Sequence, residues 1–314
     1  MIEATGLTKR YGTKTAVDDI SFVARPGRVT GFLGPNGAGK STTMRLIVGL
    51  DRPTSGTVTV NGKSYTSLAA PLREVGVLLD AKAVHTGRSA RNHLLALAAT
   101  HRIGRARVDE VIGLTGLESV AKKRVGGFSL GMGQRLGIAV ALLGDPATLI
   151  FDEPVNGLDP EGVIWVRTLA RFLAGEGRTV FLSSHLMSEM AQTADQIIVL
   201  GRGRVIADAS VAEIVAMAKG NAVRVRTPDA ARFAPLLVGA GVTPSTTEPD
   251  LFTVTGLDAP RIGELASQSG IVLHELAPIS GSLEDAYLAL TQDEVEYHSG
   301  SATAAPVTTE AASK

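Results

Sequence analysis

The sequence predicts an α/β protein in which a mostly parallel β-sheet carries a phosphate-binding loop, followed by a smaller α+β unit. Three observations lead to this prediction. Strand-like and helix-like segments alternate over residues 1–220, a glycine-rich loop joins one strand directly to one helix, and a second strand–helix series begins after residue 220.

The first predicted strands are short runs that are rich in β-branched residues. IEATGL, DISFVA and VTGFL fall within residues 1–35, and the last of them ends in the turn GPNG. A helix begins near Lys40 and runs through TTMRLIVGL before Pro53. TVTVNG and VGVLLD add two strands. The glycine loop therefore lies where a strand meets a helix N-terminus, which is a favourable place for a phosphate group.

A mostly helical subdomain is predicted at about residues 86–143. Helical periodicity is found there in RNHLLALAATHRI, RVDEVIGLTGL and QRLGIAVALLG. The α/β core resumes with the strand ATLIFDEP, the helix GVIWVRTLARFLAG, the strand RTVFLSSH and the short helix LMSEMAQTA. IIVLGRGRVIAD follows as a hairpin that turns at Gly201–Gly203.

The second unit is predicted as an α+β domain over residues 221–290. Strand, helix, strand, helix and strand are predicted in turn for AVRVRT, ARFAPLLVGAG, LFTVTG, RIGELASQSG and IVLHELA, and LEDAYLALT closes the unit with a helix. Residues 291–314 contain too few large apolar side chains to pack, so we expect a disordered tail.

The composition excludes several classes of function. The 314 residues contain 31 Lys and Arg against 31 Asp and Glu, so no charge surplus favours a nucleic-acid partner. The chain has no cysteine, which excludes disulfides and thiolate chemistry. No apolar run approaches the roughly 18 residues that span a bilayer, and MIEATGLTKRYG does not resemble a signal peptide. If the protein acts at a membrane, we expect another chain to cross it.

The segment GPNGAGKST fits the pattern G-x-x-x-x-G-K-[ST] between a strand and a helix. Its glycines let successive backbone N–H groups surround phosphate oxygens, Lys40 would reach the β- and γ-phosphates, and the Ser41 hydroxyl would bind Mg²⁺. The predicted phosphate-binding residues are Gly34, Pro35, Asn36, Gly37, Ala38, Gly39, Lys40, Ser41 and Thr42.

Two adjacent carboxylates follow the buried strand LIF. In a nucleotide site, Asp152 would hold Mg²⁺ and Glu153 would act on the attacking water as a base or a positioning group. Without the phosphate loop, the same pair would be only a solvated strand end. The loop makes the interpretation specific, because it supplies phosphates that need a metal and a nucleophile.

A second small-residue turn, FSLGMGQR, precedes the helical run LGIAVALLG. The Ser129 hydroxyl and the backbone N–H groups around Gly131 would lie at a helix N-terminus, where the helix dipole favours an anion. One domain therefore carries two candidate phosphate-binding turns.

Taken together, these motifs resemble those of the ATP-binding subunits of ABC transporters over about residues 1–220. GPNGAGKST resembles the Walker A motif, LIFDE resembles Walker B, and FSLGMGQR is similar to the family signature. NGLD, which ends at Asp159, resembles the D-loop, and His185 in FLSSH resembles the switch histidine. Tyr11 lies where the family has an aromatic residue that stacks on adenine.

The resemblance implies an ABC-type P-loop NTPase domain that binds ATP and Mg²⁺. In this family, two copies pair head to tail, so that each ATP lies between the Walker A motif of one copy and the signature of the other. Ser129, Gly131 and Asp159 would then contact the ATP of the partner copy, and His185 would contact the γ-phosphate. The homodimer would dock on an integral membrane permease, at the cytoplasmic face of the membrane, and would hydrolyse ATP to drive transport.

The chain departs from the usual family pattern at two positions. Leu130 replaces a glycine of the signature, and Asp80 replaces a glutamine that contacts Mg²⁺. A carboxylate at position 80 could ligate the metal or remain a solvated loop residue. Both departures resemble a bacterial branch that serves ABC-2 type membrane proteins, including drug and antibiotic exporters. The branch resemblance implies export, and residues 80–93 lie where a permease would be contacted.

Two alternatives remain open. A soluble ABC-type ATPase of translation or DNA repair typically has tandem cassettes, coiled coils or zinc modules, whereas this sequence has one cassette, no heptad array and no cysteine. A regulatory module would bind ATP without hydrolysing it. Glu153 and His185 argue against that module, and Asp80 leaves it open.

Overall fold

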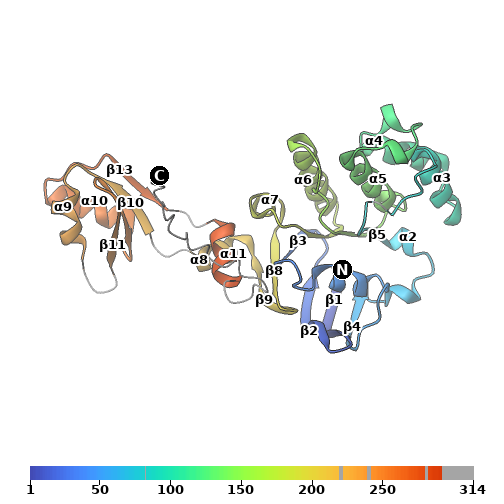
Figure 1. Cartoon of the computed structure of the whole chain (residues 1–314), viewed down its shortest axis with the longest axis horizontal. Helices are drawn as coiled ribbons and strands as arrows, with labels where there is room; N and C mark the ends of the chain where they lie inside the picture. Colours follow the sequence, from blue (N-terminus) through green and yellow to red (C-terminus); the bar gives the residue numbers. More distant parts are fainter. Residues whose placement is uncertain (82, 219–221, 239–241, 280–281, 292–314) are drawn as a thin grey trace, which may run out of the picture.

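The computed structural model describes residues 1–81, 83–218, 222–238, 242–279 and 282–291. The largest sheet has six strands in the order β5-β6-β7-β3-β8-β9 (Figure 1). The strands are β3 Arg28–Leu33, β5 Val75–Leu78, β6 Thr148–Phe151, β7 Thr179–Ser183, β8 Gln196–Gly201 and β9 Arg204–Ser210. β9 pairs antiparallel with β8, and the other neighbouring strands pair in parallel. Because all the parallel strands end at one edge, the loops that follow them converge there.

A second, antiparallel sheet has the strand order β2-β1-β4. Its strands are β1 Ile2–Tyr11, β2 Lys14–Ala24 and β4 Ser55–Val60. This sheet shares one hydrophobic core with helix α1, Lys40–Ile47, and with part of the large sheet. Phe32 and Phe181 of the large sheet lie 4.9 Å apart between ring centroids, and Phe22 of β2 lies 5.7 Å from each. The two sheets therefore hold α1 and the loop before it from both sides.

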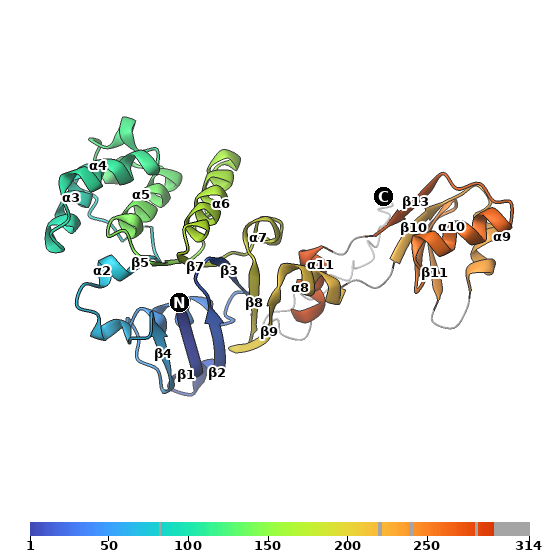
Figure 2. The same cartoon turned by 180° about the vertical axis from the view of Figure 1, so that it is seen from behind.

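The predicted helical subdomain is present beyond the β5 edge of the large sheet (Figures 1 and 2). It contains α3 Ala90–Thr100, α4 Arg105–Leu114 and α5 Leu130–Leu142. The large unit also contains the helices α2 Pro71–Glu74, α6 Pro160–Gly175 and α7 Met187–Thr193. Short 3₁₀ turns are found at Tyr65–Ser67, Glu118–Val120 and Val125–Gly127. The predicted fold class, an α/β domain with a helical insertion, is confirmed.

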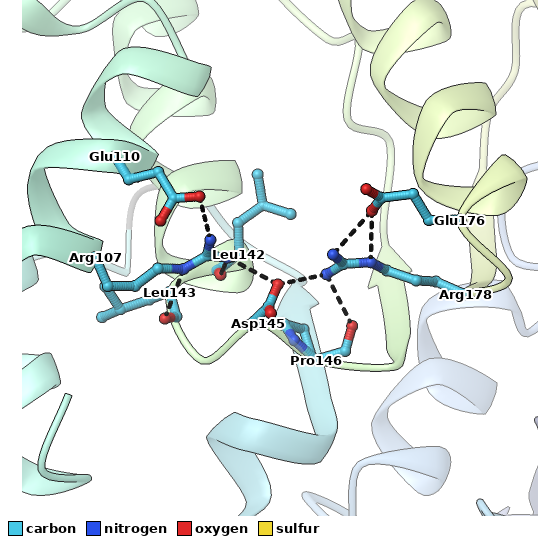
Figure 3. A network of polar contacts seen from close by, with 8 residues as sticks. All are labelled: Arg107, Glu110, Leu142, Leu143, Asp145, Pro146, Glu176 and Arg178. Atoms are coloured by element: carbon cyan, nitrogen blue, oxygen red, sulfur yellow. Dashed lines mark hydrogen bonds and ion pairs between the residues drawn. The ribbon is translucent and has the colours of Figure 1, made fainter. Parts of the chain in front are cut away.

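The carboxylate of Asp145, in the turn between α5 and β6, joins the helical subdomain to the large sheet (Figure 3). Arg107 of α4 donates to Asp145 Oδ1 at 3.1 Å and to the carbonyl oxygen of Leu142, at the end of α5, at 2.7 Å. Arg178, just before β7, donates to the same carboxylate oxygen at 2.8 Å. Asp145 has a φ of 56°, in the left-handed region that aspartate adopts more readily than most residues.

The smaller unit is a four-stranded antiparallel sheet with the order β11-β12-β10-β13. Its elements are β10 Ala222–Arg226, α9 Ala230–Phe233, a 3₁₀ turn Ala234–Leu237, β11 Thr243–Glu248, β12 Leu251–Thr255, α10 Ala259–Gln268 and β13 Glu275–Pro278. The sequence did not predict β11, because TPSTTE is polar and contains a proline. An edge strand tolerates both features, since one of its sides forms no ladder hydrogen bonds.

The last helix, α11 Leu283–Thr291, corrects the predicted domain organisation. The sequence assigned LEDAYLALT to the smaller unit, but Leu283 and Ala286 are buried in the core of the large unit. There they pack with α7 and with α8, Val211–Ala218, whose Ile214 is fully buried. The smaller sheet is thus inserted between two helices of the large unit. The predicted disordered tail lies outside the described residues from residue 292 onward.

We expect two replacements of Asp145 to distinguish how its charge and its backbone conformation each contribute to the free energy of unfolding. Asp145→Asn keeps a residue that tolerates positive φ, and it should lower the free energy of unfolding by about 0.5–1 kcal/mol, because the lost ion pairs are solvent-screened. Asp145→Ala should cost about 1 kcal/mol more, because alanine is strained in the left-handed region. Urea denaturation of both variants measures the difference, and equal losses would contradict this account.

Candidate functional site

The loop between β3 and α1 has a backbone shape that requires glycine. Gly37 and Gly39 have φ values of 85° and 102°. A β-carbon at Gly39 would collide with the backbone oxygen of Ala16, on β2, so no larger residue fits there. Gly39 is also the N-cap residue of α1, and no side chain caps that helix end. The first N–H groups of α1 are therefore directed at the space that the loop surrounds, where an anion would satisfy them.

The ammonium group of Lys40 lies inside this loop. Its Nζ donates to the carbonyl oxygens of Gly34 at 2.7 Å and Pro35 at 3.3 Å. Burial lowers the pKa of Lys40, and the nearby carboxylates of Glu153 and Asp152 partly oppose this effect. A phosphate group in the loop would place further negative charge beside this buried cation.

Asp152 and Glu153 follow β6 at the same edge of the sheet. Between β6 and β3 lies β7, and its last residue, Ser183, joins the two carboxylate residues. The Ser183 hydroxyl donates to Asp152 Oδ1 at 2.6 Å and accepts the backbone N–H of Glu153 at 2.9 Å. Glu153 has a φ of 50°, and this strained backbone turns its side chain away from the strand direction.

His185 follows β7 and contacts Glu153 directly. The distance from His185 Nδ1 to Glu153 Oε2 is 2.7 Å. The carboxylate side chain is 22% exposed and the imidazole 56% exposed, so the pair lies at the surface of the site. Gln134 of α5 donates to the backbone oxygen of Glu153 at 2.9 Å, which connects the helical subdomain to the same residue.

A cavity of about 570 Å³ opens in front of these groups. Of the residues that the sequence predicted, the cavity is lined by Tyr11, Pro35, Asn36, Gly37, Gly39, Lys40, Ser41, Thr42, Asp80, Asp152 and Glu153. Lys14, Ala16, Leu79, Ala81, Leu130, Gln134 and Asn156 complete the lining. Tyr11 and the phosphate loop lie on the same cavity although they are far apart in sequence. The two remaining loop residues, Gly34 and Ala38, are buried behind it.

The second small-residue turn is divided: Leu130 and Gln134 line the cavity of the phosphate loop, whereas Ser129 and Gly131 do not. Ser129 is the N-cap residue of α5, and its hydroxyl accepts the backbone N–H of Met132 at 3.3 Å. It lines another cavity, of about 540 Å³. Gly131 approaches the backbone oxygen of Gly157, and Asp159 caps α6 by accepting the N–H of Gly162 at 2.9 Å. These three predicted phosphate contacts are therefore not among the residues that line the cavity of Lys40.

The oxygen donors of the cavity fit a magnesium ion that shares its ligands with a phosphate. Among the described residues, no group of three or more acidic, histidine or cysteine side chains could hold a metal alone. Mg²⁺ commonly takes only one or two carboxylates and completes its shell with phosphate oxygens and water. Ser41 and Asp152 supply hydroxyl and carboxylate oxygens here, and Asp80 lies at the cavity after β5.

Ser183 and Gln134 belong to the site although the sequence pattern did not predict a role for either. FLSSH contains Ser183 and FSLGMGQR contains Gln134. Their partners are 30 and 19 residues away in the sequence. The pairing of β6 with β7 brings Ser183 to Glu153, and the position of α5 brings Gln134 there. A local sequence motif predicts neither arrangement.

Comparison with known proteins agrees with this geometry. The family model described as ABC transporter matches residues 17–156, and a model of a domain of unknown function matches residues 221–284. A model described as AAA domain, putative AbiEii toxin, Type IV TA system, matches residues 122–191. No helix among the described residues is long and apolar enough to cross a membrane.

Two relatives and one solved structure illustrate the similarity. The bacitracin transport ATP-binding protein BcrA of Bacillus licheniformis is 42% identical over 66% of this chain and 68% of its own. The daunorubicin resistance ATP-binding protein DrrA3 of Streptomyces coeruleorubidus is 33% identical over 93% of this chain and 96% of its own. A dimeric bacterial ABC transporter cassette is 25% identical, with a TM-score of 0.62 over 67% of this chain and 99% of that chain. The chain therefore belongs to the family of ATP-binding proteins of ABC transporters.

Proposed function

We propose that the chain binds and hydrolyses ATP in the 570 Å³ cavity, and that a homodimer drives export of a small molecule through a separate membrane permease. The observation that carries this proposal is the convergence of the phosphate loop and the strand-end carboxylates on one cavity. An anion cradle, a buried ammonium and a carboxylate near the expected terminal phosphate are the groups that phosphoryl transfer to water requires.

Each group has a separate part in this proposal. The loop N–H groups and Lys40 bind the β- and γ-phosphates, and Ser41 and Asp152 hold Mg²⁺. When bound there, Mg²⁺ would supply neutralisation of charge on the phosphate oxygens. Glu153 orients the attacking water and accepts its proton, and His185, already 2.7 Å from that carboxylate, contacts the γ-phosphate. Asp80 serves as an additional metal ligand, directly or through water.

The placement of the predicted signature contacts supports the dimer. Ser129, Gly131 and Asp159 do not line the cavity that contains Lys40. In a head-to-tail pair, the helix N-terminus at Ser129 contacts the γ-phosphate that the other copy holds. A similar solved cassette, with a TM-score of 0.62, is described as dimeric, which supports pairing of this chain. ATP then stabilises the closed dimer, and hydrolysis releases it.

The relatives support an export role at the membrane. One is a bacitracin transport protein and another a daunorubicin resistance protein. Since no described helix is suited to span a bilayer, the proposal requires a separate permease with several apolar segments of about 20 residues each. The ATPase subunit would lie peripherally on the cytoplasmic face, with residues 80–93 toward the permease.

Lys40→Ala should reduce ATP hydrolysis at least about 100-fold, because the variant loses the cation that stabilises charge on the transferred phosphate. Lys63→Ala is a matched control, since Lys63 is exposed and does not line the cavity. Phosphate release measures both rates, and circular dichroism checks that both variants are folded. Unchanged hydrolysis in Lys40→Ala would refute the phosphate-loop assignment.

Glu153→Gln should produce an ATP-bound dimer that elutes earlier in size-exclusion chromatography. The amide keeps the shape of the side chain but accepts no proton, so ATP stays intact between the two copies. Glu118→Gln is the control, because Glu118 lies in an exposed 3₁₀ turn away from the cavity. With ADP in place of ATP, Glu153→Gln should elute as a monomer. A Glu153→Gln variant that remains monomeric with ATP and Mg²⁺ contradicts the head-to-tail dimer.

A further inference from the structure

The aromatic ring of Tyr11 lies at the rim of the nucleotide cavity and is fastened there by its hydroxyl group. Tyr11 is the last residue of β1, is 47% exposed and lines the cavity together with the phosphate loop. Its hydroxyl donates to Asp51 Oδ2 at 2.8 Å. Stacking on a base requires only the face of the ring, so this hydrogen bond serves another purpose.

The acceptor of that bond is itself held by a cation. Arg45 Nε donates to the same oxygen of Asp51 at 2.8 Å. The Asp51 side chain is only 18% exposed, whereas that of Arg45 is 48% exposed. Hydrogen bonds from Arg45 and Tyr11 keep the pKa of the Asp51 carboxyl below its usual range, so the acceptor remains ionised at neutral pH.

The segment that carries Asp51 is fixed by contacts that do not involve Tyr11. Thr54 donates its backbone N–H to Thr8 O at 2.8 Å, and its hydroxyl accepts the N–H of Arg10 at 3.0 Å. Lys9 Nζ donates to the backbone oxygen of Arg52 at 2.7 Å. The hydrogen bond between Tyr11 and Asp51 is therefore not needed to hold the two segments together. Its remaining effect is on the orientation of the ring.

Helix α1 relates this ring to the phosphate loop. Lys40, at the first residue of α1, belongs to the loop, while Arg45 lies in its last turn, and the backbone N–H of Asp51 bonds to Arg45 O at 3.3 Å. Eight helical residues span about 12 Å. The phosphate end and the aromatic end of the cavity are thus fastened to opposite ends of one rigid element.

The Tyr11 ring is partly exposed, and a cation lies over one of its faces. The Lys9 ammonium lies 4.8 Å from the ring centroid, and Lys9 is anchored through Arg52 O. An incoming base would therefore take the opposite face. A ring that cannot rotate loses less conformational entropy when the base stacks on it.

We propose that Asp51, held by Arg45, is a positioning residue that orients the Tyr11 ring for stacking on the base of a purine nucleotide. This inference rests on the proposed function, because it assumes that the cavity binds ATP. Asp51 does not line the cavity and acts only through the tyrosine. The hydroxyl of Tyr11 then contributes to the affinity for the base and contributes nothing to the affinity for the phosphates.

Binding of ATP and of inorganic tripolyphosphate to the full chain separates these effects. Tyr11→Phe keeps the ring and removes the tether, so the Kd for ATP should rise roughly three- to tenfold while the Kd for tripolyphosphate stays unchanged. Tyr11→Ala removes the stacking surface and should raise the Kd for ATP by about ten- to 100-fold, again without an effect on tripolyphosphate. Tyr65→Phe, outside the cavity, is the matched control.

Variants of Asp51 test the positioning role itself. Asp51→Ala should match Tyr11→Phe, and the double variant should be no weaker than either single variant, because both remove the same hydrogen bond. Asp51→Asn keeps an acceptor oxygen and should rescue most of the ATP affinity. The inference is overturned if Tyr11→Phe binds ATP as tightly as the unaltered chain. An equal loss for ATP and tripolyphosphate also overturns it, because the hydrogen bond would then support only the cavity structure.

Failure of the proposed function would look different in the same experiment. An unaltered chain that binds neither ATP nor tripolyphosphate would refute the nucleotide site as a whole. Tight binding of both ligands, together with normal ATP affinity of Tyr11→Ala, would keep the phosphate site and reject the ring as the base contact.

Discussion

The hydroxyl of Ser183 is the contact on which the geometry of the site depends. It donates to Asp152 and accepts the backbone N–H of Glu153, and so fixes two functional carboxylates from the neighbouring strand. The same strand, β7, leads directly to His185 on one side of the site. β7 pairs with β6 on one edge and with β3 on the other, and β3 leads into the phosphate loop. One strand end thus sets the distances among Asp152, Glu153 and the phosphate loop.

In the proposed head-to-tail dimer, each chain supplies only part of the phosphate contacts of its own cavity. The phosphate loop with Lys40 and the carboxylates of Asp152 and Glu153 line one cavity. The side chains of Ser129 and Asp159 instead cap the N-termini of α5 and α6. A helix N-terminus that is capped by one hydroxyl still has N–H groups free for an anion. Under the proposed function, ATP would therefore link two copies of the chain. Leu130, half exposed between the two cavities, lies where the family signature has a glycine.

Local sequence patterns predicted the elements whose signal is local. The phosphate loop was predictable because positive φ values at Gly37 and Gly39 require glycine at a fixed spacing, and β6 was predictable as a continuous apolar run. The edge strand β11 was missed because TPSTTE is polar and contains a proline. The position of α11 was missed because its partners, α7 and α8, precede the inserted sheet in the sequence whereas α11 follows it. The roles of Asp51 and Ser183 were likewise not predictable, because packing of distant strands and helices brings each residue to its partner.

The most direct test of shared sites mixes two inactive variants. Lys40→Ala disables the phosphate loop of a copy, and Ser129→Asp keeps a good helix cap but places a negative charge against the partner's γ-phosphate. Each variant alone should hydrolyse almost no ATP, and their mixture should regain hydrolysis, because a mixed dimer contains one site with an intact loop and an intact signature. A mixture that stays inactive, or a Ser129→Asp variant with full activity of its own, would contradict this account.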